Sequence, residues 1–87
     1  MKSVQQCHLE LLARMFEKGI IGGNYLPIET VADWCKWDNI VRKHGGGKIK
    51  AEIHKLSKWG LVDIHGKKTV ASLTPDGVAV ARDYLGL

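Results

Sequence analysis

The sequence is poor in the residues that form covalent cross-links, metal centres and membrane spans. Among its 87 residues there are two cysteines, two prolines and one phenylalanine. Cys7 and Cys35 belong to no Cys-x-x-Cys pair, which predicts buried, reduced thiols rather than a zinc site. No apolar run approaches the roughly 20 residues of a membrane helix, and the N-terminus lacks the apolar region of a signal peptide. We therefore expect one cytoplasmic domain, residues 1–87, without membrane, metal or cofactor.

The sequence also lacks the motifs of nucleotide enzymes, although three glycines precede a lysine-rich run in RKHGGGKIKAEIHKLSKWGLV, residues 42–62. A P-loop requires Gly-x-x-x-x-Gly-Lys-Ser/Thr, but Ile49 follows Lys48, and Arg42 stands where the first glycine belongs. A dinucleotide fingerprint would need glycine at Lys50. No paired carboxylates or nucleophile motif converge on one segment, so neither an enzyme nor a small-molecule substrate is expected.

Positive charge is concentrated in the middle third of the chain. Residues 1–40 have a net charge of −1, residues 41–68 of +6, and residues 69–87 of −1. The two readings of the central segment are a solvated lysine-rich surface and a binding site for an anionic partner. The concentration favours the second.

The spacing of apolar residues predicts two helices in the first half of the chain. The first runs from about residue 3 to Lys18 and is ended by Gly19. The second begins near Pro27 and reaches about Lys36. Residues 36–47 fit either an extra helical turn or a long loop.

A third helix is predicted from about Lys48 to Trp59, with glycine at its N-cap and Gly60 at its end. At 100° per residue, its isoleucines and Leu56 fall within an arc of about 60° that faces the core. The opposite face then carries Gly47, Ala51, His54, Lys55 and Lys58, flanked by Lys48 and Lys50.

The remaining sequence predicts a hairpin and a last helix, and hence an α+β fold. Alternating β-branched segments at about 61–65 and 69–73 surround a Gly-Lys-Lys turn, which gives the hairpin a cationic tip. Thr74 is the expected N-cap of the last helix, with Pro75 in its first turn. Val78, Ala81 and Leu85 are its expected packing side.

This order of elements resembles the winged helix-turn-helix domains of archaeal and bacterial transcription regulators. The matching segments are IETVADWC as positioning helix, GGKIKAEIHKLSKWGLV as recognition helix and first wing strand, and LTPDGVAVARDYL as last helix. The resemblance covers roughly residues 8–85. It departs from the family in the long segment KWDNIVRKHGGG between the two helices, where three or four residues are usual.

The resemblance implies a small transcription regulator that binds double-stranded DNA, with the third helix in the major groove and the hairpin as a wing. Base contacts are then expected from Lys50, His54 and Lys48, and a thymine methyl contact or close approach from Ala51. Phosphate contacts are expected from Lys55, Lys58, Lys43, Arg42 and the wing residues Lys67 and Lys68. The glycines would leave helix N–H groups free for a phosphate.

Three alternatives stay open. A winged helix can serve as a protein-binding or structural module, and a basic helix can bind RNA. A homodimer would lengthen the DNA site that is read. Its surface would come from the first and last helices, unless these residues belong to the core: Leu9, Leu12, Phe16, Val80, Tyr84, Leu85 and Leu87.

Trp34 and Trp59 are expected to pack in or against the core, and the other histidines, His8, His44 and His65, show no metal-binding spacing.

Overall fold

The computed structural model describes residues 4–67 and 69–87. Within these residues, five helices and a three-stranded antiparallel sheet form an α+β fold. Lys68, one of the two expected wing lysines, lies outside the described residues. In chain order the elements are α1 (Gln6–Glu17), β1 (Leu26–Pro27), α2 (Ile28–Cys35), α3 (Trp37–His44), α4 (Ile49–Lys58), β2 (Val62–His65), β3 (Val70–Leu73) and α5 (Pro75–Leu85).

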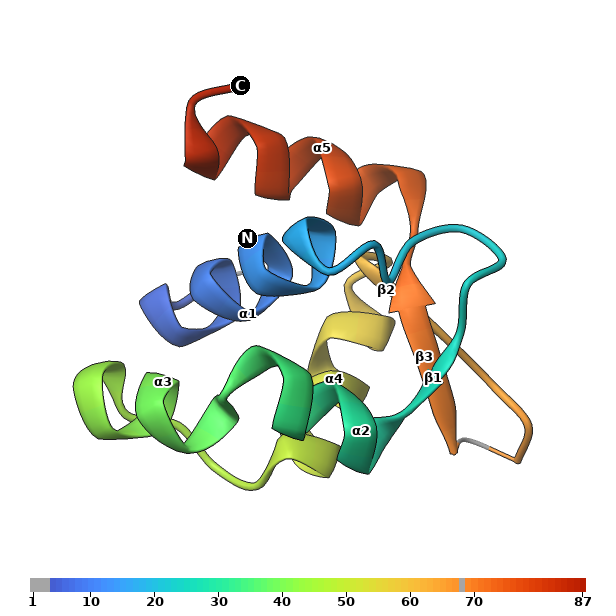
Figure 1. Cartoon of the computed structure of the whole chain (residues 1–87), viewed down its shortest axis with the longest axis horizontal. Helices are drawn as coiled ribbons and strands as arrows, with labels where there is room; N and C mark the ends of the chain where they lie inside the picture. The colour runs from blue at the N-terminus through green and yellow to red at the C-terminus, as the bar shows by residue number, and fades with distance from the viewer. Residues whose placement is uncertain (1–3, 68) are drawn as a thin grey trace.

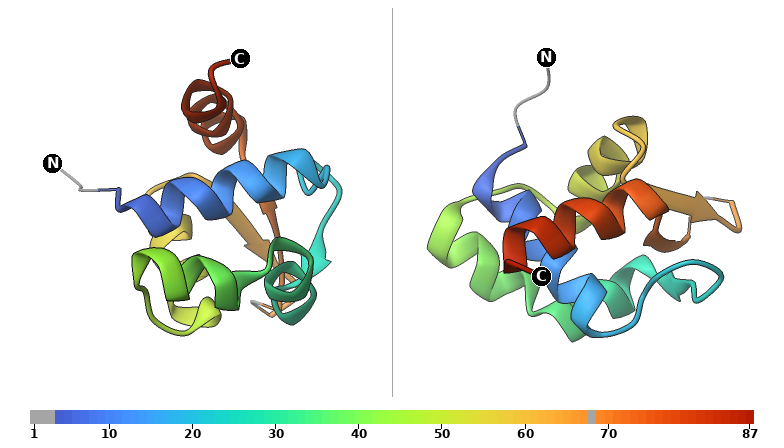
Figure 2. Two further views of the ribbon diagram at one scale, coloured as in Figure 1. Left: turned by 60° about the vertical axis from the view of Figure 1, so that its left-hand side comes forward. Right: turned by 90° about the horizontal axis from the view of Figure 1, so that it is seen from above.

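Helix α1 is the centre of the fold. Its apolar positions repeat every three or four residues, which places Leu11, Leu12 and Met15 in the core with no exposed surface. Figure 1 shows α1 between α5 on one side and α2 and α3 on the other, and the left view of Figure 2 confirms this layering. Gly19, at φ 76°, follows the helix and redirects the chain.

The predicted hairpin is confirmed, and the structure adds a strand to it. β3 lies in the middle of the sheet. β2 pairs with one side of it, with Val62 opposite Leu73, and β1 pairs with the other side, with Leu26 opposite Ala71. β1 has only two residues, Leu26 and Pro27, too few to show the alternation that reveals a strand in a sequence. Helix α4 contacts the edge strand β2, whereas α1 and α5 contact the central strand β3 (Figure 1).

The open segment 36–47 is a helix followed by a loop. Lys36 adopts a left-handed conformation, φ 56° and ψ 54°, and separates α2 from α3. α3 then turns Trp37 and Ile40 into the core, while Asp38 and Asn39 lie inside this helix rather than interrupting it. The predicted end of the second helix at about Lys36 is confirmed, and of the two alternatives for 36–47 the extra helical segment is the one found, at about two turns.

The expected limits of α4 and α5 agree with the structure to within one residue at each end. Gly60 has φ 78° after α4, as expected, but the N-cap of α4 is Lys48 and not a glycine. Thr74 caps α5 by accepting a hydrogen bond from the N–H of Gly77 at 3.0 Å. No helix among the described residues has the length and hydropathy needed to cross a membrane.

The proposed dimer surface is largely used inside the chain, where α1 and α5 pack against each other. Tyr84 of α5 accepts a hydrogen bond from Gln6 at 2.5 Å and donates one to Glu10 of α1 at 3.3 Å. Of the seven residues considered for dimerisation, Leu12 is buried and Leu87 is 70% exposed. The others are half-buried: Leu9, Phe16, Val80, Tyr84 and Leu85.

Candidate functional site

Helix α4 separates an apolar face from a basic one. Ile53 and Leu56 have no exposed surface, and Glu52 shares their side of the helix. On the solvent side lies a groove of about 530 Å³. Six of the ten residues expected to contact nucleic acid line it: Lys48, Lys50, Ala51, His54, Lys55 and Lys58. Among the described residues, this lining contains no carboxylate.

The surface of this groove is mainly carbon, although four of its six lining residues are lysines. Ala51 is exposed and small, and the lysine stems supply the remaining apolar surface, since a long cationic side chain keeps its ammonium group in water. The groove therefore combines an apolar floor with a cationic rim. This arrangement can approach the edge of a base while its charges meet phosphates.

The basic face continues from α4 toward the hairpin. Lys50 also borders a hollow of about 220 Å³ formed with Pro27, Ile28 and Glu29 at the start of α2 and with Thr69 beside β3. Lys67 is exposed in the β2–β3 turn and has φ 59°. The lysine face of α4 thus reaches Thr69, just before β3, through Lys50.

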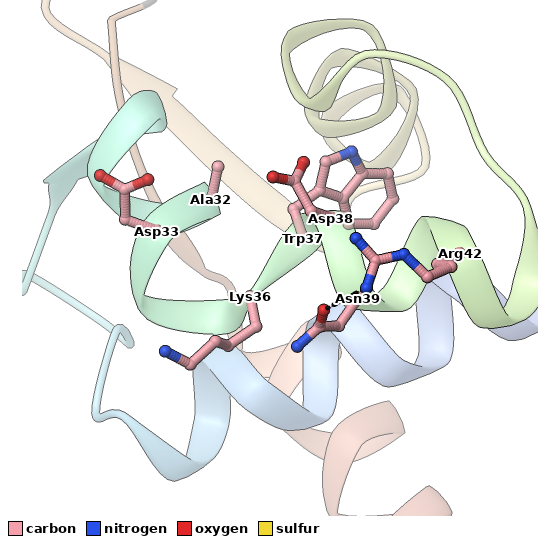
Figure 3. Close-up of a pocket in the computed structure, with 7 residues that line it drawn as sticks. All are labelled: Ala32, Asp33, Lys36, Trp37, Asp38, Asn39 and Arg42. Atoms are coloured by element: carbon pink, nitrogen blue, oxygen red, sulfur yellow. Dashed lines mark hydrogen bonds between the residues drawn. The ribbon is translucent and has the colours of Figure 1, made fainter.

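Arg42 approaches the basic face from α3. Together with Trp37, Val41 and Asp38 it lines a groove of about 790 Å³ that extends to Lys48. A smaller cleft of about 260 Å³ also includes Arg42 and extends to Lys36 (Figure 3). In Figure 3, Arg42 and Asn39 point toward each other, and their hydrogen bond measures 3.4 Å.

Lys43 is exposed on α3 but lines none of these grooves. The structure therefore brings Arg42 next to the α4 residues through Lys48 and leaves Lys43 apart from them.

The sequence analysis missed the buried polar cluster behind the basic face. Glu52 is 5% exposed and His8 is 2% exposed, and Glu52 Oε1 lies 2.8 Å from His8 Nε2. Glu52 Oε2 accepts the N–H of Gly47 at 2.8 Å. A signal was present, because residues 49, 52, 53 and 56 share one helix face at i, i+3, i+4 and i+7 spacing. A charged residue within an apolar face indicates a partnered buried charge.

These hydrogen bonds keep Glu52 ionised. Burial acts to raise the pKa of the Glu52 carboxyl, but hydrogen bonds from His8 and from the Gly47 N–H, with the nearby Lys55 ammonium, outweigh it and lower the pKa. Lys55 Nζ lies 3.5 Å from Glu52 Oε1. Lys55, expected to contact phosphate, is therefore shared with an internal carboxylate.

One expectation about the glycines is corrected. Gly47 was expected to leave its N–H free for a phosphate at the start of α4, but Glu52 accepts that hydrogen bond. A side chain from the first turn of α4 thus occupies the position near the helix dipole that favours an anion.

Two predictions about the tryptophans have opposite outcomes. Trp34 was expected to pack in or against the core and is 47% exposed on α2, because its position on the helix lies between the core face and solvent. Trp59 is half-buried, as expected, with its ring edge-on to His8 at 5.3 Å between centroids. Trp37 is buried, and its indole N–H donates to the carbonyl of Gly47 at 3.0 Å.

The remaining metal-ligand and thiol residues form no shared site in the described part of the chain. His65 contacts Asp63 at 3.1 Å on the hairpin, and His44 is half-buried on α3. Within residues 4–67 and 69–87, no group of three histidine, cysteine or acidic side chains could hold a metal ion. Cys7 and Cys35 are free and buried, which confirms the expectation for the thiols.

Comparisons of the chain with protein-family models, with curated proteins and with solved structures found no significant match. Function therefore has to be inferred from the geometry of α4 and its neighbours.

Proposed function

We propose that this protein binds double-stranded DNA through the basic face of α4 and that its fold is a winged helix-turn-helix. In this assignment α2 is the positioning helix, α4 the recognition helix and the β2–β3 hairpin the wing. The order of α1, β1, α2, α4, β2 and β3 supports it. Helix α3 is an insertion between the two helices of the motif.

The observation that carries the proposal is the groove on α4 that four lysines and His54 share with Ala51. A solvated charged surface does not require its cations to surround a small apolar residue. In a helix that enters the major groove the arrangement has a use, because a small residue lets the helix approach base edges while the surrounding cations reach the phosphates.

The positions of the side chains suggest a division of roles. Lys50, His54 and Lys48 lie nearest the first turns of α4 and are proposed base or near-base contacts, with Ala51 against a thymine methyl. Lys55 and Lys58 in the last turns, together with Lys67 on the wing, are proposed phosphate contacts. The other proposed phosphate contacts are Arg42, Lys43 and Lys68.

The insertion of α3 supports a wider contact than α4 alone provides. Arg42 and Lys43 are in the last turn of α3, directly before the loop that leads to Lys48. Cations near a helix C-terminus are favoured by the helix dipole. Arg42 extends the basic face through the groove that it shares with Lys48, and Lys43 is a proposed separate phosphate contact.

Alanine substitutions test the division of roles. Lys58→Ala and Lys43→Ala are expected to weaken binding equally for all duplex sequences, whereas Lys50→Ala and His54→Ala are expected to change the preference between sequences. Selection of preferred sequences from a random duplex pool, repeated for each variant, measures both effects. If none of the four substitutions alters binding, the basic face of α4 is not the DNA site.

Titration of the wild-type protein with duplex DNA and with duplex RNA separates these two partners. A helix enters the wide major groove of B-form DNA but not the deep, narrow major groove of A-form RNA. We expect tighter binding to duplex DNA than to duplex RNA of matching sequence. If the protein binds RNA as tightly as DNA or more tightly, RNA becomes the proposed partner in place of DNA.

For the biological role, we propose a cytoplasmic, nucleoid-associated regulator that acts by occupying its DNA site. Homodimerisation would be restricted to what α1 and α5 still expose, chiefly Leu87. Analytical ultracentrifugation with and without DNA would show whether the chain dimerises alone, on DNA or not at all.

Binding to another protein is a second candidate, favoured by Trp34. This side chain is 47% exposed on α2, and tryptophan is enriched at protein interfaces. Trp34→Ala is expected to leave DNA affinity unchanged if the proposal above is right.

A further inference from the structure

Glu52 is a buried charge on the helix proposed to contact DNA. A buried carboxylate is costly unless hydrogen bonds and opposite charges compensate for the lost water. Its two oxygens have separate donors, since Oε1 lies 2.8 Å from His8 Nε2 and Oε2 accepts from the Gly47 N–H at 2.8 Å. Glu52 therefore connects α1, α4 and the loop between α3 and α4.

The direction of the hydrogen bond from His8 is fixed by its other nitrogen. His8 Nδ1 accepts from the backbone N–H of Gln5 at 3.2 Å, so it carries no hydrogen. The hydrogen of the neutral ring is then on Nε2 and is donated to Glu52. Because His8 is 2% exposed within α1, the folded core determines where this donor stands.

The backbone of Gly47 is held on both sides of its Cα atom. Its N–H is bound by Glu52 of α4, and its carbonyl accepts from Trp37 Nε1 of α3 at 3.0 Å. A Cβ atom at this position would lie 3.0 Å from Glu52 Oε2. Lys48 follows immediately and lines both the α4 groove and the groove that contains Arg42.

We propose that Glu52, held by His8, is a positioning residue for DNA binding: it fixes the Gly47 peptide and thereby the place of Lys48 on the basic face. This inference rests on the proposed function. A buried ion pair or hydrogen-bonded charge contributes little net stability compared with an apolar pair, so its effect is expected chiefly in the placement of the loop.

The proposal and simple electrostatics predict opposite signs. Glu52 is negatively charged and lies beside a surface that would bind phosphates. Removal of a negative charge there should strengthen DNA binding if charge alone decides. If Glu52 positions Lys48, its replacement by a neutral residue should weaken binding.

The first experiment compares two Glu→Gln variants in DNA titrations by fluorescence anisotropy. Glu52→Gln retains size but leaves one accepting oxygen for two donors. Glu29→Gln removes the same charge from an exposed residue beside Lys50 and serves as the control. We expect Glu52→Gln to lower affinity about fivefold and Glu29→Gln to leave it unchanged or to raise it.

A double-mutant cycle distinguishes positioning from a general loss of structure. In the Glu52→Gln background, Lys48→Ala should cost much less than in the wild type, because Lys48 is no longer held in place. Lys58→Ala, at the far end of α4, should cost the same in both backgrounds. An equal fall in the contributions of both lysines would show a general structural defect and overturn the positioning role.

A second pair of variants acts from α1, outside the basic face. His8→Leu removes the donor to Glu52 without changing a charge, and His8→Gln retains an N–H group that can donate. We expect DNA affinity to fall with His8→Leu and to be largely restored with His8→Gln. Circular dichroism shows whether each variant is folded. If Glu52→Gln does not fold, the two His8 variants decide whether Glu52 has a positioning role.

The outcomes separate the inference from the function on which it rests. Weaker binding by Glu52→Gln with selective loss of the Lys48 contribution supports it, as does rescue by His8→Gln. Wild-type binding combined with equal or tighter binding by Glu52→Gln, or by His8→Leu where Glu52→Gln does not fold, overturns the positioning role alone. If the wild type does not bind DNA, both the function and the inference fail.

Discussion

The two junctions of α4 are held differently. The junction before the helix is held by polar side chains, and the junction after it by contacts between backbone atoms. Before α4, the N–H of Gly47 is held by the Glu52 carboxylate and the carbonyl of Gly47 by the Trp37 indole. After α4, the Leu61 carbonyl accepts the N–H of Thr74 at 3.2 Å and lies where a Cβ of Gly77 would be, at 2.0 Å. The first junction can adjust by moving a side chain, whereas the second cannot.

This difference separates a region suited to function from one suited to stability. Side chains that hold a loop can place a lysine for a ligand and still yield when the ligand binds. Backbone atoms in direct contact set how α5 lies on the turn after α4 and permit no comparable movement. Substitutions at the two junctions should therefore affect different properties.

The largest expected effect is that of Gly77→Ala. The added methyl group would meet the backbone oxygen of Leu61 at 2.0 Å, and relief requires α5 to shift as a whole. We expect a loss of about 3 kcal/mol or more in the free energy of unfolding. Urea denaturation measures it, and a loss below about 1 kcal/mol would show that the contact is loose.

Acid should weaken the first junction before the second. The pKa of Glu52 is lowered in the folded protein, so its stabilising contribution is present above the ordinary value of 4.5 and is lost as pH falls below it. We expect a small loss of stability over this range, because protonation removes the charge that the His8 and Gly47 donors stabilise.

Denaturation of the wild type and of Glu52→Gln between pH 6 and 3 isolates this contribution, because the variant lacks the titrating group. Parallel stability curves for the two proteins would mean that Glu52 is not stabilising. Asp63→Asn controls for an exposed carboxylate whose pKa is also lowered, through its hydrogen bond with Tyr25.

Gly47→Ala gives the matched contrast to Gly77→Ala. The new methyl group would lie 3.0 Å from the end of the flexible Glu52 side chain, which can move away. Stability should fall by less than about 1 kcal/mol, while DNA affinity falls about threefold because Lys48 is displaced. A large loss of stability without a change in DNA binding would reverse the contrast between the junctions.

The smallest expected effect concerns Cys35, which touches neither junction. Burial raises the pKa of its thiol to about 12, although the positive charges of Arg14 and Lys18 act to lower it. Because the thiolate is the reactive form, Cys35 should resist alkylation at pH 8 in the folded protein and react at once in urea. Mass spectrometry of iodoacetamide-treated protein checks this.

The parts of the fold that sequence patterns predicted are those with local signals. Thr74-Pro75 marks the start of α5, Gly60 marks the end of α4, and alternation marks the hairpin. Features without a local signal were left open or missed. The segment 36–47 stayed open between helix and loop, since a left-handed lysine such as Lys36 has no sequence signature, and β1 was missed because it is a strand only through its pairing with β3.

The candidate site shows the same division. Helical periodicity was sufficient to place Lys48, Lys50, Ala51, His54, Lys55 and Lys58 on one outward face, which the structure shows as one groove. The cluster behind that face joins residues 8, 47 and 52, and its long-range contact cannot be read from spacing within one helix. Glu52 on an apolar face indicated that a partner must exist but not that it is His8.

The central claim is tested most directly by the salt dependence of binding to a labelled random DNA duplex, followed by fluorescence anisotropy. If α4 and its neighbours meet the phosphate backbone, the slope of log affinity against log salt should correspond to about four to seven released counterions. Lys58→Ala should reduce that number by about one. Absence of binding at low salt would contradict the account and direct attention to the protein-binding alternative at Trp34.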